Sequence, residues 1–159
     1  AKRDIVQNAI DLWTETGLGT PRVAILSAVE TVTSKIPSTI EAAALCKMAD
    51  RGQITGGVLD GPLAFDNAID PEAVKIKGIK SPVAGRAQIL IVPDLEAGNM
   101  LAKNLTFLAR ADAAGIVLGA RVPVILTSRA DSVRSRMASA AVAVLYADAR
   151  RQKATVAAV

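Results

Sequence analysis

Short apolar runs alternate with amphipathic segments along this chain. The apolar runs cover residues 22–27, 56–59, 88–92, 115–118 and 122–126, and each is a candidate strand. The run at 22–27 is of the kind that is buried on both faces of a parallel sheet. Helical periodicity covers residues 4–13, 38–48, 95–110 and 133–151. This alternation predicts an α/β fold, a three-layer sandwich with a mostly parallel sheet.

Local signals place several element ends. Ser38 follows Pro37, and Glu41 lies three residues further on, so the pattern predicts a helix that begins with a capping box. Asp60-Gly61 predicts a turn that closes the strand at 56–59. The carboxylate of Asp60 would then lie at the carboxyl end of a strand, where α/β folds bind their ligands.

Composition excludes several classes of chemistry. The chain has 159 residues, enough for one domain with a hydrophobic core, and contains no His and one Cys. It can form neither a Ser-His-Asp triad nor a His-ligated zinc site, and we expect no bound metal. Cys46 is expected to be a small core side chain. A single thiol suits a reducing compartment, and we expect a cytoplasmic protein.

The charge pattern favours small anionic ligands. The formal net charge is +4, but the basic residues are dispersed and only 3% of the residues are aromatic. Nucleic-acid binding is therefore disfavoured. The longest apolar runs are too short to span a membrane, so we expect no membrane partner either.

Three segments that follow predicted strands carry candidate chemistry. They are residues 60–62, 93–99 and 127–132. In the last segment, hydroxyls and the Arg129 guanidinium precede a helix start, which outlines an anion site. A helix cap explains Ser128, Asp131 or Ser132 equally well. Gly61 and Gly98 fit either a close approach to a ligand or tight packing.

Five motifs in order identify a family resemblance. They are RGQI at 51–54, DGPLAFDNA at 60–68, VAGRA at 83–87, PDLEAGN at 93–99 and LTSRADS at 126–132. Together they resemble the phosphate acetyltransferase and phosphate butyryltransferase family, over residues 21 to 146. The wording of DGPLAFDNA and LTSRADS looks closer to the butyryltransferase branch, or to the related domain fused after an enoyl-CoA hydratase-like segment, than to the stand-alone acetyltransferases.

The resemblance implies reversible transfer of an acetyl or butyryl group between coenzyme A and inorganic phosphate. Coenzyme A would be a co-substrate, with no tightly bound cofactor. The implied fold is similar to isocitrate and isopropylmalate dehydrogenases, with two domains flanking a cleft, and the implied assembly is a homodimer.

The chain would supply only the carboxyl-terminal part of that fold. Residues 1–20 would be a helix of a missing amino-terminal half. Residues 21–130 would be the α/β domain with the acyltransferase motifs, and residues 131–159 a long helix and tail that pack on the cleft.

The resemblance also suggests roles for individual residues. Arg129 would offset the repulsion between phosphate and coenzyme A, and Ser128 or Thr127 would stabilise the oxyanion. Asp131 would either accept the thiol proton or cap the last helix. The remaining substrate-binding candidates are Asp60, Gly61, Asn99 and Lys103.

One departure from the family pattern keeps an alternative function open. The acetyltransferases carry an aspartate a few residues after the equivalent of Arg129, where this chain has Arg134, Ser135 and Arg136. The alternative is a non-catalytic domain that senses acyl-CoA, like the similar domain of some malic enzymes. A dehydrogenase is disfavoured because no motif with paired metal-binding aspartates is present.

Overall fold

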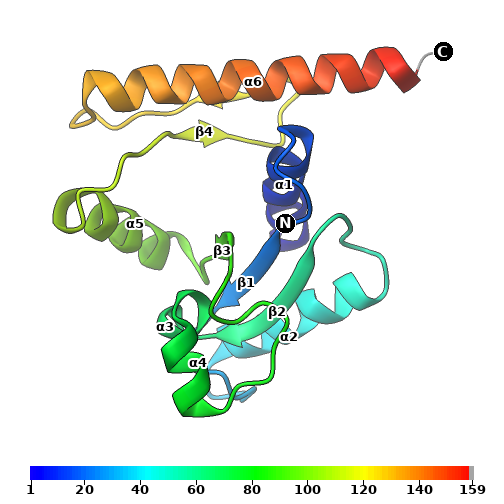
Figure 1. The fold of residues 1–159 in the computed structure, drawn as a ribbon, viewed down its shortest axis with the longest axis vertical. Helices are drawn as coiled ribbons and strands as arrows, with labels where there is room; N and C mark the ends of the chain where they lie inside the picture. Colours follow the sequence, from blue (N-terminus) through cyan, green and yellow to red (C-terminus); the bar gives the residue numbers. More distant parts are fainter. Residues whose placement is uncertain (158–159) are drawn as a thin grey trace.

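The computed structural model describes residues 1–157, which form two layered units (Figure 1). The first unit contains α1 (Lys2–Glu15), β1 (Arg22–Leu26), α2 (Pro37–Asp50), β2 (Val58–Leu63), α3 (Phe65–Ile69), α4 (Pro71–Lys77), β3 (Ile89–Ile91), α5 (Leu95–Lys103) and the π-helix η1 (Asn104–Leu108). The second contains β4 (Ile116–Val117), β5 (Val124–Ile125) and α6 (Val133–Ala157).

The main sheet has three parallel strands in the order β2-β1-β3. Alternate residues of β1 point to opposite faces. Val23 and Ile25 pack with residues of α1 and α2 in one core cluster. Ala24 and Leu26 pack in a second cluster with residues of α3, α4 and α5. Helices therefore cover both faces of a parallel sheet, and the predicted α/β class is confirmed.

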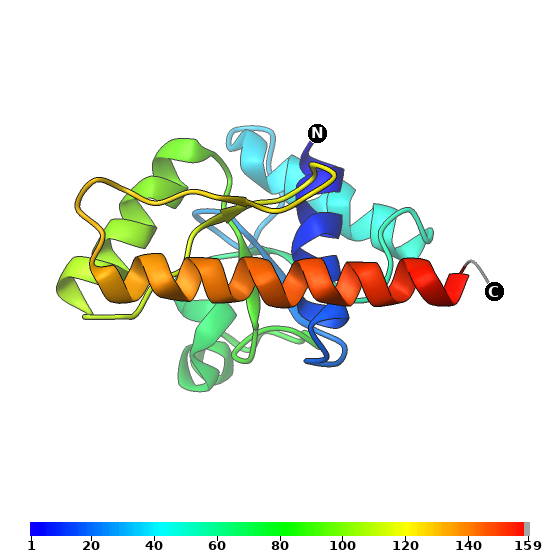
Figure 2. The same cartoon turned by 90° about the horizontal axis from the view of Figure 1, so that it is seen from above.

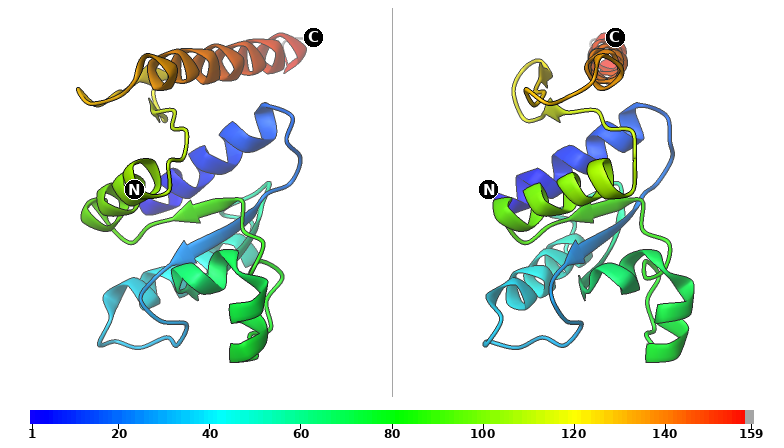
Figure 3. Two further views of the ribbon diagram at one scale, coloured as in Figure 1. Left: turned by 60° about the vertical axis from the view of Figure 1, so that its left-hand side comes forward. Right: turned by 90° about the vertical axis from the view of Figure 1, so that its left-hand side faces the viewer.

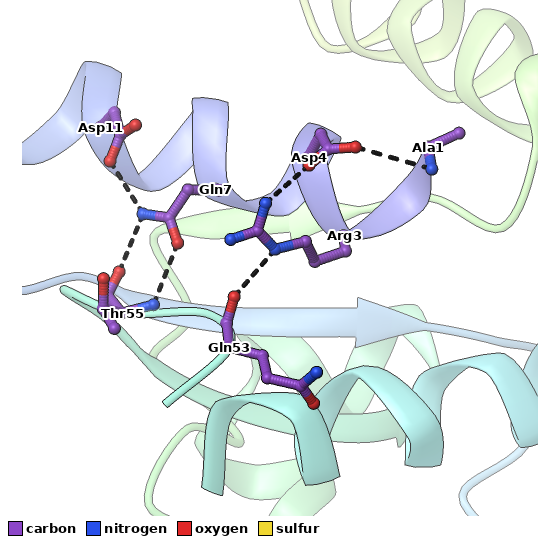
Figure 4. Close-up of polar contacts among 7 residues, drawn as sticks. All are labelled: Ala1, Arg3, Asp4, Gln7, Asp11, Gln53 and Thr55. Carbon is purple, nitrogen blue, oxygen red and sulfur yellow. Dashed lines mark hydrogen bonds and ion pairs between the residues drawn. The ribbon is translucent and has the colours of Figure 1, made fainter. Parts of the chain in front are cut away.

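Helix α1 is fixed to the first unit by buried and polar contacts. Val6 and Ile10 are fully buried against the sheet. Along its exposed edge, Arg3 Nε donates to the carbonyl of Gln53 at 2.8 Å, and the Gln7 amide pairs with the backbone of Thr55 (Figure 4). Residues 1–20 were predicted to belong with a missing half, whereas this packing leads us to propose that they belong with the three-layer unit.

The predicted strands at 115–118 and 122–126 do not extend the parallel sheet. Both predicted strands are present, but they form the separate antiparallel pair β4–β5. A short connection through Gly119, whose φ is +94°, reverses the chain, and this permits only antiparallel pairing. Ser139 Oγ of α6 accepts a hydrogen bond from Gly115 N at 2.9 Å and holds the helix beside the pair (Figure 3).

Two local predictions also need correction. Asp60-Gly61 is not a turn, because β2 continues through it to Leu63 and Asp60 pairs with Ala24 of β1. Ser38 does not cap α2: the cap position is Ile36 and Pro37 begins the helix. The Ser38 hydroxyl instead shares a 2.8 Å hydrogen bond with Ser27 Oγ at the end of β1.

The long helices lie near their predicted positions. The helix predicted at 95–110 is α5 followed directly by η1, and the one predicted at 133–151 is α6. The predicted segment 131–159 includes residues 158–159, which lie outside the described residues. Within residues 1–157, no helix is both long and apolar enough to cross a bilayer.

Candidate functional site

The loop at 127–132 connects β5 to α6 and is closed by its own hydrogen bonds. Ser128 N donates to Asp131 Oδ2 at 2.6 Å, and Asp131 N donates to the Ser128 carbonyl at 3.1 Å. Ser132 Oγ accepts a hydrogen bond from Ser135 N at 3.1 Å, as an N-cap does. Ser132 is therefore the cap of α6, and the alternative that Asp131 caps this helix was wrong.

Arg129 lies at the tip of this loop with an exposed side chain. Within residues 1–157, it takes part in none of the ion pairs, whereas Arg134 Nη2 lies 2.6 Å from Asp112 Oδ2. A guanidinium has five N–H donors in a planar fork that matches a phosphate or a carboxylate. The loop therefore presents a cation that is available to an anionic ligand.

Helix α5 carries two more predicted residues. Asn99 and Lys103 lie four positions apart, so they share one face of the helix. Asn99 also lines a shallow hollow with Leu95, Glu96 and Met100. Lys103 Nζ lies 5.7 Å from the centre of the Phe107 ring, which holds this ammonium beside η1.

Asp60 and Gly61 lie inside β2, where packing explains the glycine. A Cβ at Gly61 would lie 2.7 Å from the Ile25 carbonyl oxygen, so only glycine fits against β1. Asp60 Oδ1 accepts a hydrogen bond from Gly61 N at 2.8 Å. At Gly98 a Cβ would lie 2.9 Å from Val92 Cγ2. Both glycines therefore support the packing alternative.

The structure does not gather the three predicted segments into one cluster. Helix α5 and the start of α6 lie on the same side of the molecule, at the left of Figure 1, whereas β2 lies near its centre in the main sheet (Figures 1 and 2). Within the described residues, no side-chain hydrogen bond joins the 127–132 loop to Asn99, Lys103 or Asp60. The loop and α5 are thus separate parts of the candidate site.

An apolar groove of about 560 Å³ lies between the two units, and sequence reasoning did not predict it. Its walls come from α1, β3, the residue that follows β4 and α6, including Leu12, Trp13, Leu90, Leu118 and Leu145. The Trp13 indole N–H donates to the Leu18 carbonyl at 3.1 Å and is already satisfied. The only possible signal was the apolar face of α1. Leu12 and Trp13 belong to this face, and they line the groove instead of joining the core cluster that α1 forms with the sheet.

Other candidate reactive groups are occupied by structural contacts. Cys46 packs against the first core cluster, and burial raises the pKa of its thiol to about 12. Lys77 Nζ lies 3.0 Å from both Glu30 and Asp66, and its hydrogen bond lowers the pKa of Asp66. Cys46 is therefore no nucleophile at neutral pH, and Asp66 is committed to an ion pair.

Comparisons with known proteins give one consistent picture. A family model described as phosphate acetyl/butaryl transferase matches residues 1–144. A phosphate acetyltransferase of Rhizobium meliloti is 84% identical over all 159 residues, which span 50% of that protein. A phosphate butyryltransferase of Clostridium acetobutylicum is 47% identical over 92% of this chain and 48% of its own length.

Solved structures agree in fold and in extent. A branched-chain phosphotransacylase from Enterococcus faecalis V583 superposes with a TM-score of 0.83 at 37% identity, over 92% of this chain and 52% of its own. The chain thus spans about half the length of the curated relatives it matches. The identity to the acetyltransferase exceeds that to the butyryltransferase, although the motif wording had favoured the butyryl branch.

Proposed function

The chain belongs to the phosphate acetyltransferase and phosphate butyryltransferase family, and from this we propose that it serves reversible acyl transfer between coenzyme A and inorganic phosphate. The acyl group we propose is acetyl, because the higher identity is to a phosphate acetyltransferase. Coenzyme A then acts as a co-substrate that enters and leaves with each cycle.

The observation that carries the proposal is the exposed Arg129 in the hydrogen-bonded loop before α6. Phosphate must approach a thioester while coenzyme A, a second polyanion, occupies the same site. A guanidinium at this position offsets this repulsion and aligns the phosphate oxygen with the thioester carbon. In this proposal Arg129 binds the phosphate, and its neighbours act on the thioester.

Ser128 and Thr127 are proposed to stabilise the oxyanion that forms when phosphate attacks. Hydroxyl donors that already point at the developing charge lower the barrier without reorganisation. The backbone of Ser128 is held by the two hydrogen bonds that join its N–H and carbonyl to Asp131. Asp131 uses Oδ2 for the Ser128 amide, and its second oxygen is proposed to take the thiol proton of coenzyme A in the reverse reaction.

Asn99 and Lys103 are proposed to bind the polar part of coenzyme A. They share one exposed face of α5, on the same side of the molecule as the start of α6 (Figure 2). An ammonium and an amide suit phosphate and amide groups respectively. Asp60 and Gly61 stay sequence predictions, and the close contact of Gly61 with Ile25 argues for a packing role there.

The acting protein is proposed to be larger than this chain. The relatives are about twice as long, so the proposed active unit includes a polypeptide equivalent to their other half. We also propose a homodimer in the cytoplasm, as the family resemblance and the single cysteine suggest.

A second candidate is an acyl-CoA sensor without transferase activity. The observation in its favour is Arg134, which stands near where the acetyltransferases carry an aspartate and is bound to Asp112. A sensor needs the coenzyme A contacts but neither phosphate nor a base.

The test uses a hybrid in which this chain replaces the matching half of the R. meliloti acetyltransferase. The transferase predicts that thiol release from acetyl-CoA requires inorganic phosphate and stops when phosphate is withheld. Phosphate-independent or absent thiol release would refute the transferase. Acyl-CoA binding by calorimetry in an inactive hybrid would support the sensor instead.

A further inference from the structure

Ser139 is a polar side chain that is fully buried in an alanine-rich part of α6. The helix around it reads ASAAVA over residues 138–143. Alanine forms helix better than serine and needs no hydrogen-bond partner for its side chain. A buried hydroxyl, in contrast, is unfavourable unless it is hydrogen-bonded. The contacts of Ser139 therefore indicate what a serine does at this position that an alanine could not.

The Ser139 hydroxyl makes two hydrogen bonds, one as donor and one as acceptor. Ser139 Oγ donates to the Ser135 carbonyl oxygen at 2.7 Å, a contact common for serine within a helix. It also accepts a hydrogen bond from Gly115 N at 2.9 Å. Gly115 directly precedes β4, which runs along α6 in Figure 1. The hydroxyl thus joins the first turns of α6 to the hairpin.

Gly115 extends this connection to β5. Leu126 N donates to the Gly115 carbonyl at 3.0 Å. A Cβ at position 115 would overlap the Leu126 carbonyl oxygen, so only glycine permits this close approach. Leu126 is the last residue before the 127–132 loop, and Ser135 lies in the first turn of the helix that follows it. The hydrogen bonds from Leu126 through Gly115 and Ser139 to Ser135, here called the Ser139 bridge, therefore join the two ends of the loop.

A second contact between the same segments is exposed to water. The Arg134 and Asp112 side chains that form an ion pair are 78% and 69% exposed, and exposed pairs of this kind contribute little to stability. Ser139 is shielded from solvent, where hydrogen bonds do not compete with water and are stronger. The Ser139 bridge is therefore the contact that can hold the ends of the loop in one fixed relation.

We propose that Ser139 is a positioning residue for the 127–132 loop. The hydrogen bonds between Ser128 and Asp131 fix the shape of the loop, whereas the Ser139 bridge fixes where the loop lies relative to β5 and α6. A displacement of about 1 Å at a reacting group can cost about 100-fold in rate. The inference deepens the proposed function, on which it rests, by naming a residue that orients Arg129 without touching the substrate.

The first test measures catalysis by the hybrid enzyme with Ser139→Ala, which removes the bridging hydroxyl and adds no bulk. The kcat/KM for phosphate should fall at least about tenfold, because Arg129 is no longer held in place. The matched control is Ala143→Gly, which weakens the same buried face of α6 one turn further on and takes no part in the Ser139 bridge. It should keep kcat/KM within about twofold of the parent value.

A double-mutant cycle separates positioning from a general loss of structure. If Ser139 acts through Arg129, the loss caused by Ser139→Ala should shrink to about threefold or less when Arg129→Ala is already present. Losses that simply multiply would overturn the proposal. An unchanged kcat/KM in Ser139→Ala alone would overturn it as well.

Hydrogen exchange in the same hybrids gives a readout that needs no substrate. In Ser139→Ala the backbone amides of Ser128 and Asp131 should exchange at least about tenfold faster, and in Ala143→Gly they should not. Amides of β1 should stay protected in both variants. Unchanged exchange in the loop, or a loss of protection that includes β1, would overturn the proposal. Faster loop exchange in a hybrid without phosphate-dependent activity would refute the proposed function and leave the positioning role of Ser139 supported.

Discussion

Lys153 of α6 donates a hydrogen bond to Glu15 of α1, with 2.9 Å between Lys153 Nζ and Glu15 Oε1. The Glu15 side chain is only 13% exposed, and within the described residues its Oε2 atom has no hydrogen-bond partner. Tyr146 is buried at the same junction, and the Arg150 guanidinium lies 5.7 Å from the centre of its ring. This junction ties the second unit to the first.

Lys153→Met should therefore destabilise the chain through the junction. The substitution leaves the Glu15 carboxylate largely buried without its cation, and the expected loss is about 1 kcal/mol in the free energy of unfolding. Arg151→Met is the matched control, because its partner Asp148 is on the same helix and both side chains are exposed. Urea unfolding measures both, and an equal effect of the two variants would contradict this role of the junction.

Cys46 should be unreactive in the folded chain and should make stability depend on alkaline pH. Burial raises its pKa from 9.0 to about 12, so the fold favours the protonated thiol. The stabilisation is fully present below pH 9 and is lost as the pH rises from 9 toward 12.

Disulfide-exchange reagents at pH 8 should react with Cys46 only after unfolding. Unfolding curves at pH 8 and pH 10.5 should differ more for the parent than for Cys46→Ala. Rapid labelling of the native chain at pH 8 would show that the thiol is more accessible than its contacts with the core indicate.

Gly61→Ala should disrupt the sheet far more than Gly98→Ala. The new methyl group at position 61 would meet the backbone oxygen of Ile25, which cannot move without breaking strand pairing. A loss of about 2 kcal/mol or more is expected. At position 98 the methyl group meets a side-chain methyl of Val92, and alanine favours the helix. Thermal unfolding ranks the two, and the opposite ranking would refute the packing explanation.

Local patterns predicted the elements of the three-layer unit well. The apolar runs at 22–27 and 88–92 became β1 and β3, and Pro71 begins α4 as its fixed φ favours. These features depend on residues that are close along the chain, so local sequence patterns are enough to predict them. The strand pairing of Asp60 depends on Ala24, more than thirty positions away, and the local turn signal of Asp60-Gly61 was misleading for that reason.

The hairpin and the groove could not be read from the sequence for a related reason. The apolar runs around Ile116 and Val124 look the same whether they pair in parallel or antiparallel. The groove between α1, β3 and α6 joins side chains as distant as Leu12 and Leu145. The loop at 127–132 was predicted from its residue types. Only the structure shows that Ser132 caps α6, whereas Asp131 accepts a hydrogen bond from the backbone N–H of Ser128.

The most direct measurement is phosphate-dependent thiol release by the hybrid enzyme with Arg129→Ala. If the Arg129 side chain binds the phosphate, kcat/KM should fall at least about 30-fold, which corresponds to about 2 kcal/mol of transition-state stabilisation. Arg121→Ala, another exposed arginine in the turn between β4 and β5, should retain the parent rate. A rate for Arg129→Ala close to that of Arg121→Ala would contradict the account.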